Sequence, residues 1–113
     1  MVVGSGFVKL WIPEVRSLKE KRSILTKLIK KTQNSFNISI AEVGDQDDWK
    51  RSTIGFSLVG NDRRLIDAKV DHVLSFIEGL HLAEVIGSQI EIVSLSQSPD
   101  AFPPYGDEKY GDI

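Results

Sequence analysis

The sequence predicts an α+β sandwich, in which one four-stranded antiparallel sheet carries two helices on one face. Two segments with apolar residues every three or four positions indicate helices, and four alternating segments indicate strands near residues 8–12, 36–41, 53–59 and 88–95. Their order is strand, helix, strand, strand, helix, strand. The 113 residues suffice for one domain with a single core. We expect that domain to span residues 1–96 and a loosely ordered acidic tail to span 97–113.

The first strand and first helix follow from alternation and capping. Side chains alternate along the first strand, with one side formed by Val8, Leu10 and Ile12 and the other by Phe7, Lys9 and Trp11. Pro13 ends the strand because proline has no N–H for the ladder. Ser17 followed by Glu20 predicts a capping box at the start of a helix that ends near Asn34. The apolar stripe of this helix consists of Leu18, Leu25, Leu28 and Ile29.

The second half repeats the pattern. The segments 36–41 and 53–59 are close enough to form an antiparallel hairpin across a turn at 44–48. Asn61 or Asp62 predicts the cap of a second helix, whose buried stripe is Ile66, Val70, Val73 and Ile77. Two split βαβ units in this order predict a ferredoxin-like fold. Such a fold covers one sheet face with helices and leaves the other open.

Composition excludes several classes of protein. There is no cysteine, which excludes disulfides and cysteine-ligated metal, and no apolar run reaches the roughly 20 residues of a membrane span. The N-terminus lacks the basic start of a signal peptide, so we expect a cytoplasmic protein. No phosphate-binding glycine motif and no activated serine are evident, so we expect no enzyme activity and no cofactor. Carboxylates in 42–48 leave Mg²⁺ or Ca²⁺ as a minor alternative, but their spacing matches no EF-hand, and we expect no metal. We expect instead that Asp47 caps this loop, that Trp49 packs over the sheet edge and that Arg51 pairs with a carboxylate.

The first helix is strongly basic in a chain of net charge −2. Residues 16–31 hold seven cations and one anion, and residues 58–113 hold ten acidic residues against four basic ones. One interpretation is a phosphate-binding surface at the helix N-terminus and outer face, with Trp49 and Arg51 at an adjacent edge. Its candidate residues on the helix are Arg16, Lys19, Lys21, Arg22, Lys27 and Lys30, of which Lys21 and Arg22 border the apolar stripe and should lift their charges into solvent. The other interpretation is that Arg16 and Arg22 pair internally with Glu14, Glu20 or the acidic segment 42–48.

The open sheet face carries a second candidate surface. Phe7, Lys9 and Trp11 should lie at its middle because the first strand is central in this topology. Aromatic side chains beside a cation can stack on RNA bases, but the neighbouring strand offers only small residues there. A homodimer interface, or cover by the aromatic residues of the tail, is favoured over base stacking.

Three sequence blocks carry a family resemblance. Residues Ser17 to Arg22, the set Gln46, Asp47, Trp49 and Arg51, and residues Gly60 to Arg63 resemble the YlxP-like family of small bacterial proteins over residues 1–95. The resemblance implies a ferredoxin-like fold, no established activity, and a gene context of translation initiation and ribosome maturation. Two features depart from the family: Asp48 stands where an apolar residue is usual, and the acidic tail is not a hallmark.

The sequence therefore predicts a non-catalytic accessory protein. Its expected partner is ribosomal RNA or the ribosome, bound through phosphate contacts of the basic helix. The alternative is a homo-oligomeric interaction module that uses the open sheet face and has no nucleic-acid role.

Overall fold

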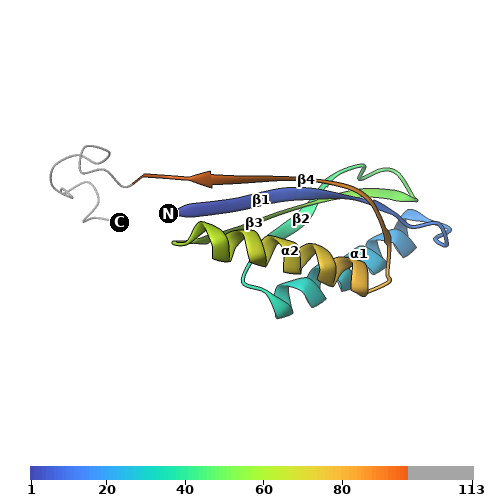
Figure 1. Cartoon of the computed structure of the whole chain (residues 1–113). Coiled ribbons are helices and arrows are strands. Elements are labelled where there is room, and N and C mark those ends of the chain that lie inside the picture. Colours follow the sequence, from blue (N-terminus) through green and yellow to red (C-terminus); the bar gives the residue numbers. More distant parts are fainter. Residues whose placement is uncertain (97–113) are drawn as a thin grey trace, which may run out of the picture.

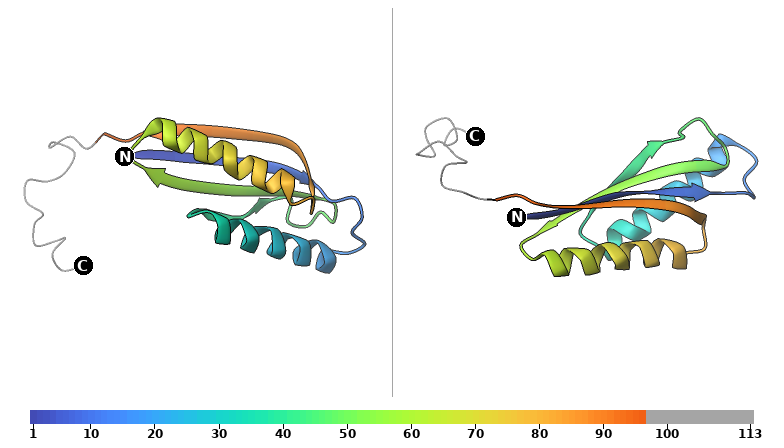
Figure 2. Two further views of the ribbon diagram at one scale, coloured as in Figure 1. Left: turned by 60° about the horizontal axis from the view of Figure 1, so that its bottom comes forward. Right: turned by 45° about the horizontal axis from the view of Figure 1, so that its top comes forward.

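The computed structural model describes residues 1–96, which form one βαββαβ unit. The elements are β1 (Val2–Trp11), α1 (Leu18–Ser35), β2 (Ser39–Gly44), β3 (Arg51–Gly60), α2 (Arg63–Gly79) and β4 (Glu84–Ser94). The sheet has the order β2-β3-β1-β4, and every neighbouring pair is antiparallel. Both helices lie on the same side of the sheet (Figures 1 and 2). The predicted ferredoxin-like fold is thus confirmed. The expected tail, 97–113, lies outside the described residues.

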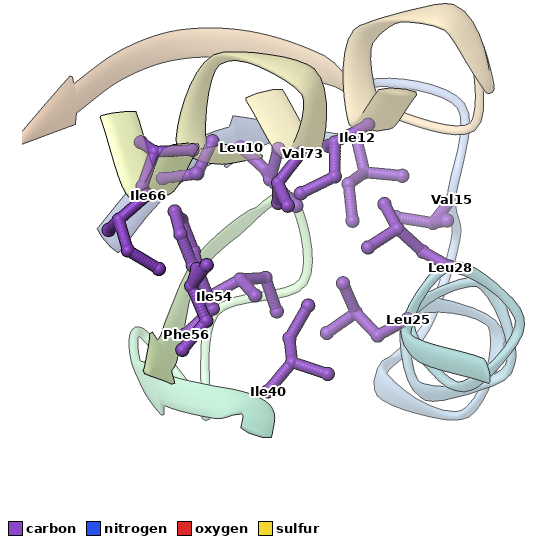
Figure 3. Packing of buried hydrophobic residues seen from close by; sticks show 14 of the residues in the cluster. Leu10, Ile12, Val15, Leu25, Leu28, Ile40, Ile54, Phe56, Ile66 and Val73 are labelled. Atoms are coloured by element: carbon purple, nitrogen blue, oxygen red, sulfur yellow. The ribbon is translucent and has the colours of Figure 1, made fainter. Parts of the chain in front are cut away.

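The core fills the space between the sheet and the two helices. The side of β1 predicted to face inward is buried at Val8, Leu10 and, just beyond the strand, Ile12. All four predicted core residues of α2 are buried, and Leu25 and Leu28 bury the centre of α1. Figure 3 shows Leu10, Ile66 and Val73 gathered with Ile54 and Phe56 of β3 in one cluster, with Leu25 and Leu28 on its α1 side. The 3.6-residue and two-residue periods therefore identified most of the core correctly.

Strand boundaries differ from the expectation because glycines and caps interrupt the pattern. β1 begins at Val2, since Gly4 and Gly6 keep the strand conformation while breaking its apolar alternation. The second strand was expected from Phe36 but starts at Ser39. Phe36 instead ends α1: its N–H donates to the carbonyl of Thr32 (3.0 Å), and its ring packs edge-on against Phe76 (centroids 5.4 Å apart).

The last two strands are longer than expected. β3 extends the prediction by two residues at its start and one at its end, whereas β4 starts at Glu84 instead of Ser88. A register shift opposite Lys9 and Leu10 interrupts the alternation of β4 around Ile86. None of the helices within residues 1–96 is long and apolar enough to cross a membrane.

Candidate nucleic-acid interface and its buried lysine

Most of the candidate cations of α1 lie on its solvent side. Lys19, Lys27 and Lys30 are exposed on the face away from the buried Leu25 and Leu28. Arg16 before the helix, Arg22 and Lys31 are exposed as well. None of these six side chains forms an ion pair within residues 1–96, so the expected pairing of Arg16 and Arg22 with nearby carboxylates is not seen there. The helix thus presents an outer row of cations without acidic partners in the described part of the chain.

Lys21 is the exception, and the expectation that it lifts its charge into solvent is wrong. Its side chain is fully buried, at 0% exposure. The ammonium donates a hydrogen bond to the backbone carbonyl of Asp45 (2.6 Å) and lies 3.2 Å from Oε2 of Glu42. Lys21 is therefore not available to an outside phosphate. It serves the protein's own acidic segment instead.

The acidic partners of Lys21 are themselves hydrogen-bonded. Ser52 Oγ donates to Glu42 Oε2 at 2.6 Å. Asp45 has a left-handed backbone (φ 57°), which aims its carbonyl at Lys21 while its carboxylate accepts from Thr53 Oγ1 (2.9 Å) and Lys9 Nζ (3.4 Å). No buried side-chain nitrogen or oxygen is left without a partner within residues 1–96. The network ties α1 to the turn between β2 and β3.

The electrostatic consequence is clearest at Asp45. The hydrogen bond from Thr53 holds the pKa of the Asp45 carboxyl below its usual value, and the ammonium groups of Lys9 and Lys21 act in the same direction. Partial desolvation opposes them. The carboxylate is therefore kept ionised in the folded protein.

The N-terminus of α1 already has an internal anion. Ser17 Oγ accepts from the N–H of Glu20 (3.2 Å), as the predicted N-cap requires. The Glu20 carboxylate accepts from the N–H of Arg16 (2.7 Å) and not from Ser17, so the second half of the expected capping box is displaced by one residue. Because Glu20 places its own charge at this end, the helix terminus is a poorer anion site than the outer row of cations.

Arg51 lies on a different face of the molecule from the α1 cations, whereas Trp49 lies in the loop that contacts the start of α1. Trp49 is half-exposed (51%) in the loop that Lys21 ties to α1. The guanidinium of Arg51 lies over the ring of Trp11, 5.7 Å from its centroid, on the sheet face opposite the helices. Arg51 was expected to pair with a carboxylate, but it forms no ion pair within residues 1–96. The loop is capped by Asp48, whose Oδ1 accepts from the N–H groups of Lys50 and Arg51, and not by Asp47 as expected.

The open sheet face carries two aromatic side chains along β1, with both apolar and charged residues on the strands beside it. Phe7 and Trp11 are half-buried, and Lys9 is exposed beside them. A shallow groove of about 350 Å³ runs beside Phe7, floored by small residues of β2 and β3 such as Ala41, Gly55 and Ser57. Large apolar side chains also stand exposed on this side of the strands: Val43 (60%), Val59 (62%) and Val93 (46%).

Sequence reasoning missed two features. Lys21 shares one helical stripe with Leu25, Leu28 and Thr32, and this spacing was the available signal for its burial. A cavity of about 590 Å³ at the far end of α2 was not foreseen, because its lining comes from four separate segments. Glu14, Glu78 and His81 are among its polar residues, and the two carboxylates repel an anion. Within residues 1–96, no three histidine, aspartate or glutamate side chains are grouped to hold a metal ion.

Comparisons with solved structures concern the fold. The chain is similar to the designed protein Foldit4 (12% identity, 84% of this chain and 98% of that chain, TM-score 0.44). It is also similar to a dimeric ferredoxin-like protein from an uncultured marine organism (13% identity, 84% and 97%, TM-score 0.42). Identities this low bear on the fold alone, and the fold assignment itself rests on the strand order and connections given above.

Comparisons of sequence identify the family. The family model described as "Protein of unknown function (DUF503)" matches residues 3–90. The Uncharacterized protein YlxP of Bacillus subtilis (strain 168) is 36% identical over 77 residues, which cover 68% of this chain and 84% of that protein. The chain therefore belongs to the DUF503, or YlxP-like, family of proteins of unknown function.

Proposed function

We propose that this protein binds structured RNA through phosphate contacts made by the outer row of α1. The row consists of Lys19, Lys27 and Lys30 and is extended by Arg16 before the helix and by Arg22 and Lys31 on its two flanks. The observation that carries the proposal is that these exposed cations have no acidic partner within residues 1–96, whereas Lys21 on the inner side of the same helix is neutralised. Unpaired surface cations along one helix attract a polyanion, because phosphate contact releases condensed counterions.

The geometry suits a backbone and not a base-specific contact. Lys19 and Lys30 are separated by about 16 Å along the helix axis at a rise of 1.5 Å per residue, long enough to follow several phosphates. Lysine side chains carry no sequence information when they contact phosphates. Trp49, half-exposed in the loop beside the start of α1, adds a ring on which an unpaired base can stack. The family's gene context makes ribosomal RNA the first RNA to test.

The test is fluorescence anisotropy with a labelled ribosomal RNA fragment at 50 to 200 mM salt. If four of the six cations contact phosphates, the affinity for RNA should fall by about 50- to 150-fold over this fourfold range of salt. Replacing Lys27 and Lys30 by glutamine should lower the slope of log K against log salt by about 1.4 to 1.8.

The matched control removes two exposed cations from α2, Arg64 and Lys69, by the same substitution. This control should leave the slope unchanged. Absence of binding at 50 mM salt, or equal slopes for the two double variants, would contradict the proposal.

A further inference from the structure

We infer that the open sheet face is the interface of a homodimer whose two-fold axis runs nearly along β1. The inference is independent of RNA binding, since α1 lies on the other side of the sheet (Figure 2). It rests on the residues that flank β1 at each level of the sheet. These residues are fixed by the strand registers of β3 and β4.

A two-fold axis along the central strand places β3 of one copy over β4 of the other. Residues that lie at the same level on the two sides of β1 within one chain then meet between chains. At the level of Val3 these are Val59 and Val93, and at the level of Trp11 they are Arg51 and Glu84. An apolar pair thus closes one end of the interface and an ion pair closes the other.

The intermediate levels are complementary too. Beside Ser5, the hydroxyl of Ser57 would meet the carboxylate of Glu91. Beside Phe7, the longer side chain of Gln89 would lie over Gly55 and against Val43, which partly covers that glycine. Donor meets acceptor and small meets large, so the face is complementary to itself. If the partner of this face were a different protein, the residues of β3 would not need to complement those of β4.

The central strand permits the approach. Phe7 and Trp11 would lie close to the axis and meet their counterparts. The ammonium of Lys9 forms an ion pair with the carboxylate of Asp45 (3.4 Å). This ion pair offsets the repulsion that the two facing lysines of a dimer would otherwise cause. Two sheets packed in this way keep their strands within about 30° of each other.

The face is large enough for a stable dimer. Three strands face each other across this axis, β3, β1 and β4, which are about 4.8 Å apart and ten or eleven residues long. At about 3.3 Å per residue they give a flat area of roughly 450 to 500 Å² before side-chain relief is counted. A standard protein–protein interface buries about 800 Å² per partner. The open face supplies most of that area.

The experiment is sedimentation velocity of the full chain between 1 and 200 µM. Wild type should sediment as a dimer at high concentration. Arg51→Glu and Glu84→Arg should each weaken the dimer at least about tenfold, because each places like charges together twice in the assembly. The double variant Arg51→Glu/Glu84→Arg should recover wild-type affinity to within about threefold. Circular dichroism confirms that each variant is folded.

Val59→Asp supplies a second readout at the apolar end. It should also weaken the dimer, whereas Leu65→Asp on α2, at a similar exposure of 57%, should not. A wild type that stays monomeric at 200 µM overturns the inference. So does a dimer unaffected by all three single variants on this face. A monomer in which Val59→Asp lowers RNA affinity would assign the face to RNA instead.

Discussion

The burial of Lys21 leads to a large predicted effect for one substitution, Lys21→Met. Methionine keeps most of the apolar stem but removes the ammonium group. Glu42, whose side chain is only 19% exposed, then keeps its charge with Ser52 as its remaining side-chain partner within residues 1–96. The carbonyl of Asp45 loses the 2.6 Å hydrogen bond.

The magnitude follows from burial. Breaking a buried ion pair by removing one partner costs about 3–5 kcal/mol, and the partial exposure of Glu42 favours the lower end. We expect the free energy of unfolding to fall by about 3 kcal/mol. For a domain of this size the melting temperature should fall by roughly 12–24 °C. Because small domains are stable by only about 5–15 kcal/mol, the loss is a large share of the total.

Urea and thermal unfolding followed by circular dichroism measure this effect. The matched control is Lys19→Met, an exposed lysine two residues earlier, which should stay within about 0.5 kcal/mol of wild type. Adding Glu42→Gln to Lys21→Met should restore part of the loss, with a coupling energy of at least about 1 kcal/mol. A Lys21→Met variant within 1 kcal/mol of wild type would refute the reasoning that this charge pair holds α1 to the hairpin.

Three further predictions concern Asp45, Gly4 and Asp62. The folded-state pKa of Asp45 is below its usual 3.8, so the contribution of Asp45 to stability is complete above pH 3.8 and is lost as pH falls through the folded pKa. Asp45→Asn should therefore flatten the fall of the melting temperature between pH 5 and pH 2, and an unchanged profile would count against this role of Asp45. A Cβ at Gly4 would lie 2.7 Å from Cγ2 of Ile66, so Gly4→Ala should lower the free energy of unfolding in urea by about 1–3 kcal/mol. Gly79→Ala, with open space around the glycine, should be neutral or stabilising, and equal effects of the two variants would argue against close packing of α2 on β1. Asp62 caps α2 by accepting from two N–H groups, so Asp62→Ala should cost about 1 kcal/mol in the same assay, and a loss below 0.3 kcal/mol would contradict that role.

Local sequence patterns predicted the elements well where each residue's role depends on its neighbours in the chain. The cap at Ser17 and the buried stripe of α2 are examples, since both depend on residues within one or two turns of a helix. Predictions failed where contacts with a segment distant in the chain determine the bounds of an element. The expected start of the second strand was wrong because Phe36 completes α1 and packs on Phe76, forty residues away.

The candidate site divides in the same way. The outer row of α1 was predictable, because exposure on a helix follows from periodicity. The interaction of Arg51 was not predicted, because the aromatic ring that its guanidinium contacts belongs to Trp11 on another strand. Asp48 was taken for an odd substitution in a motif, and the structure gives it the role of loop cap.

The sequence by itself determined the βαββαβ order, the identity of the core and the concentration of positive charge on one helix, because periodicity and composition are properties of the chain. Only the tertiary structure decided how the one buried charge among them is neutralised. Lys21 has the same side chain as Lys19, but the fold brings Glu42 and the carbonyl of Asp45 to one and leaves the other in water. A buried ammonium needs such partners to offset its desolvation, and only the packing of β2 and β3 against α1 supplies them.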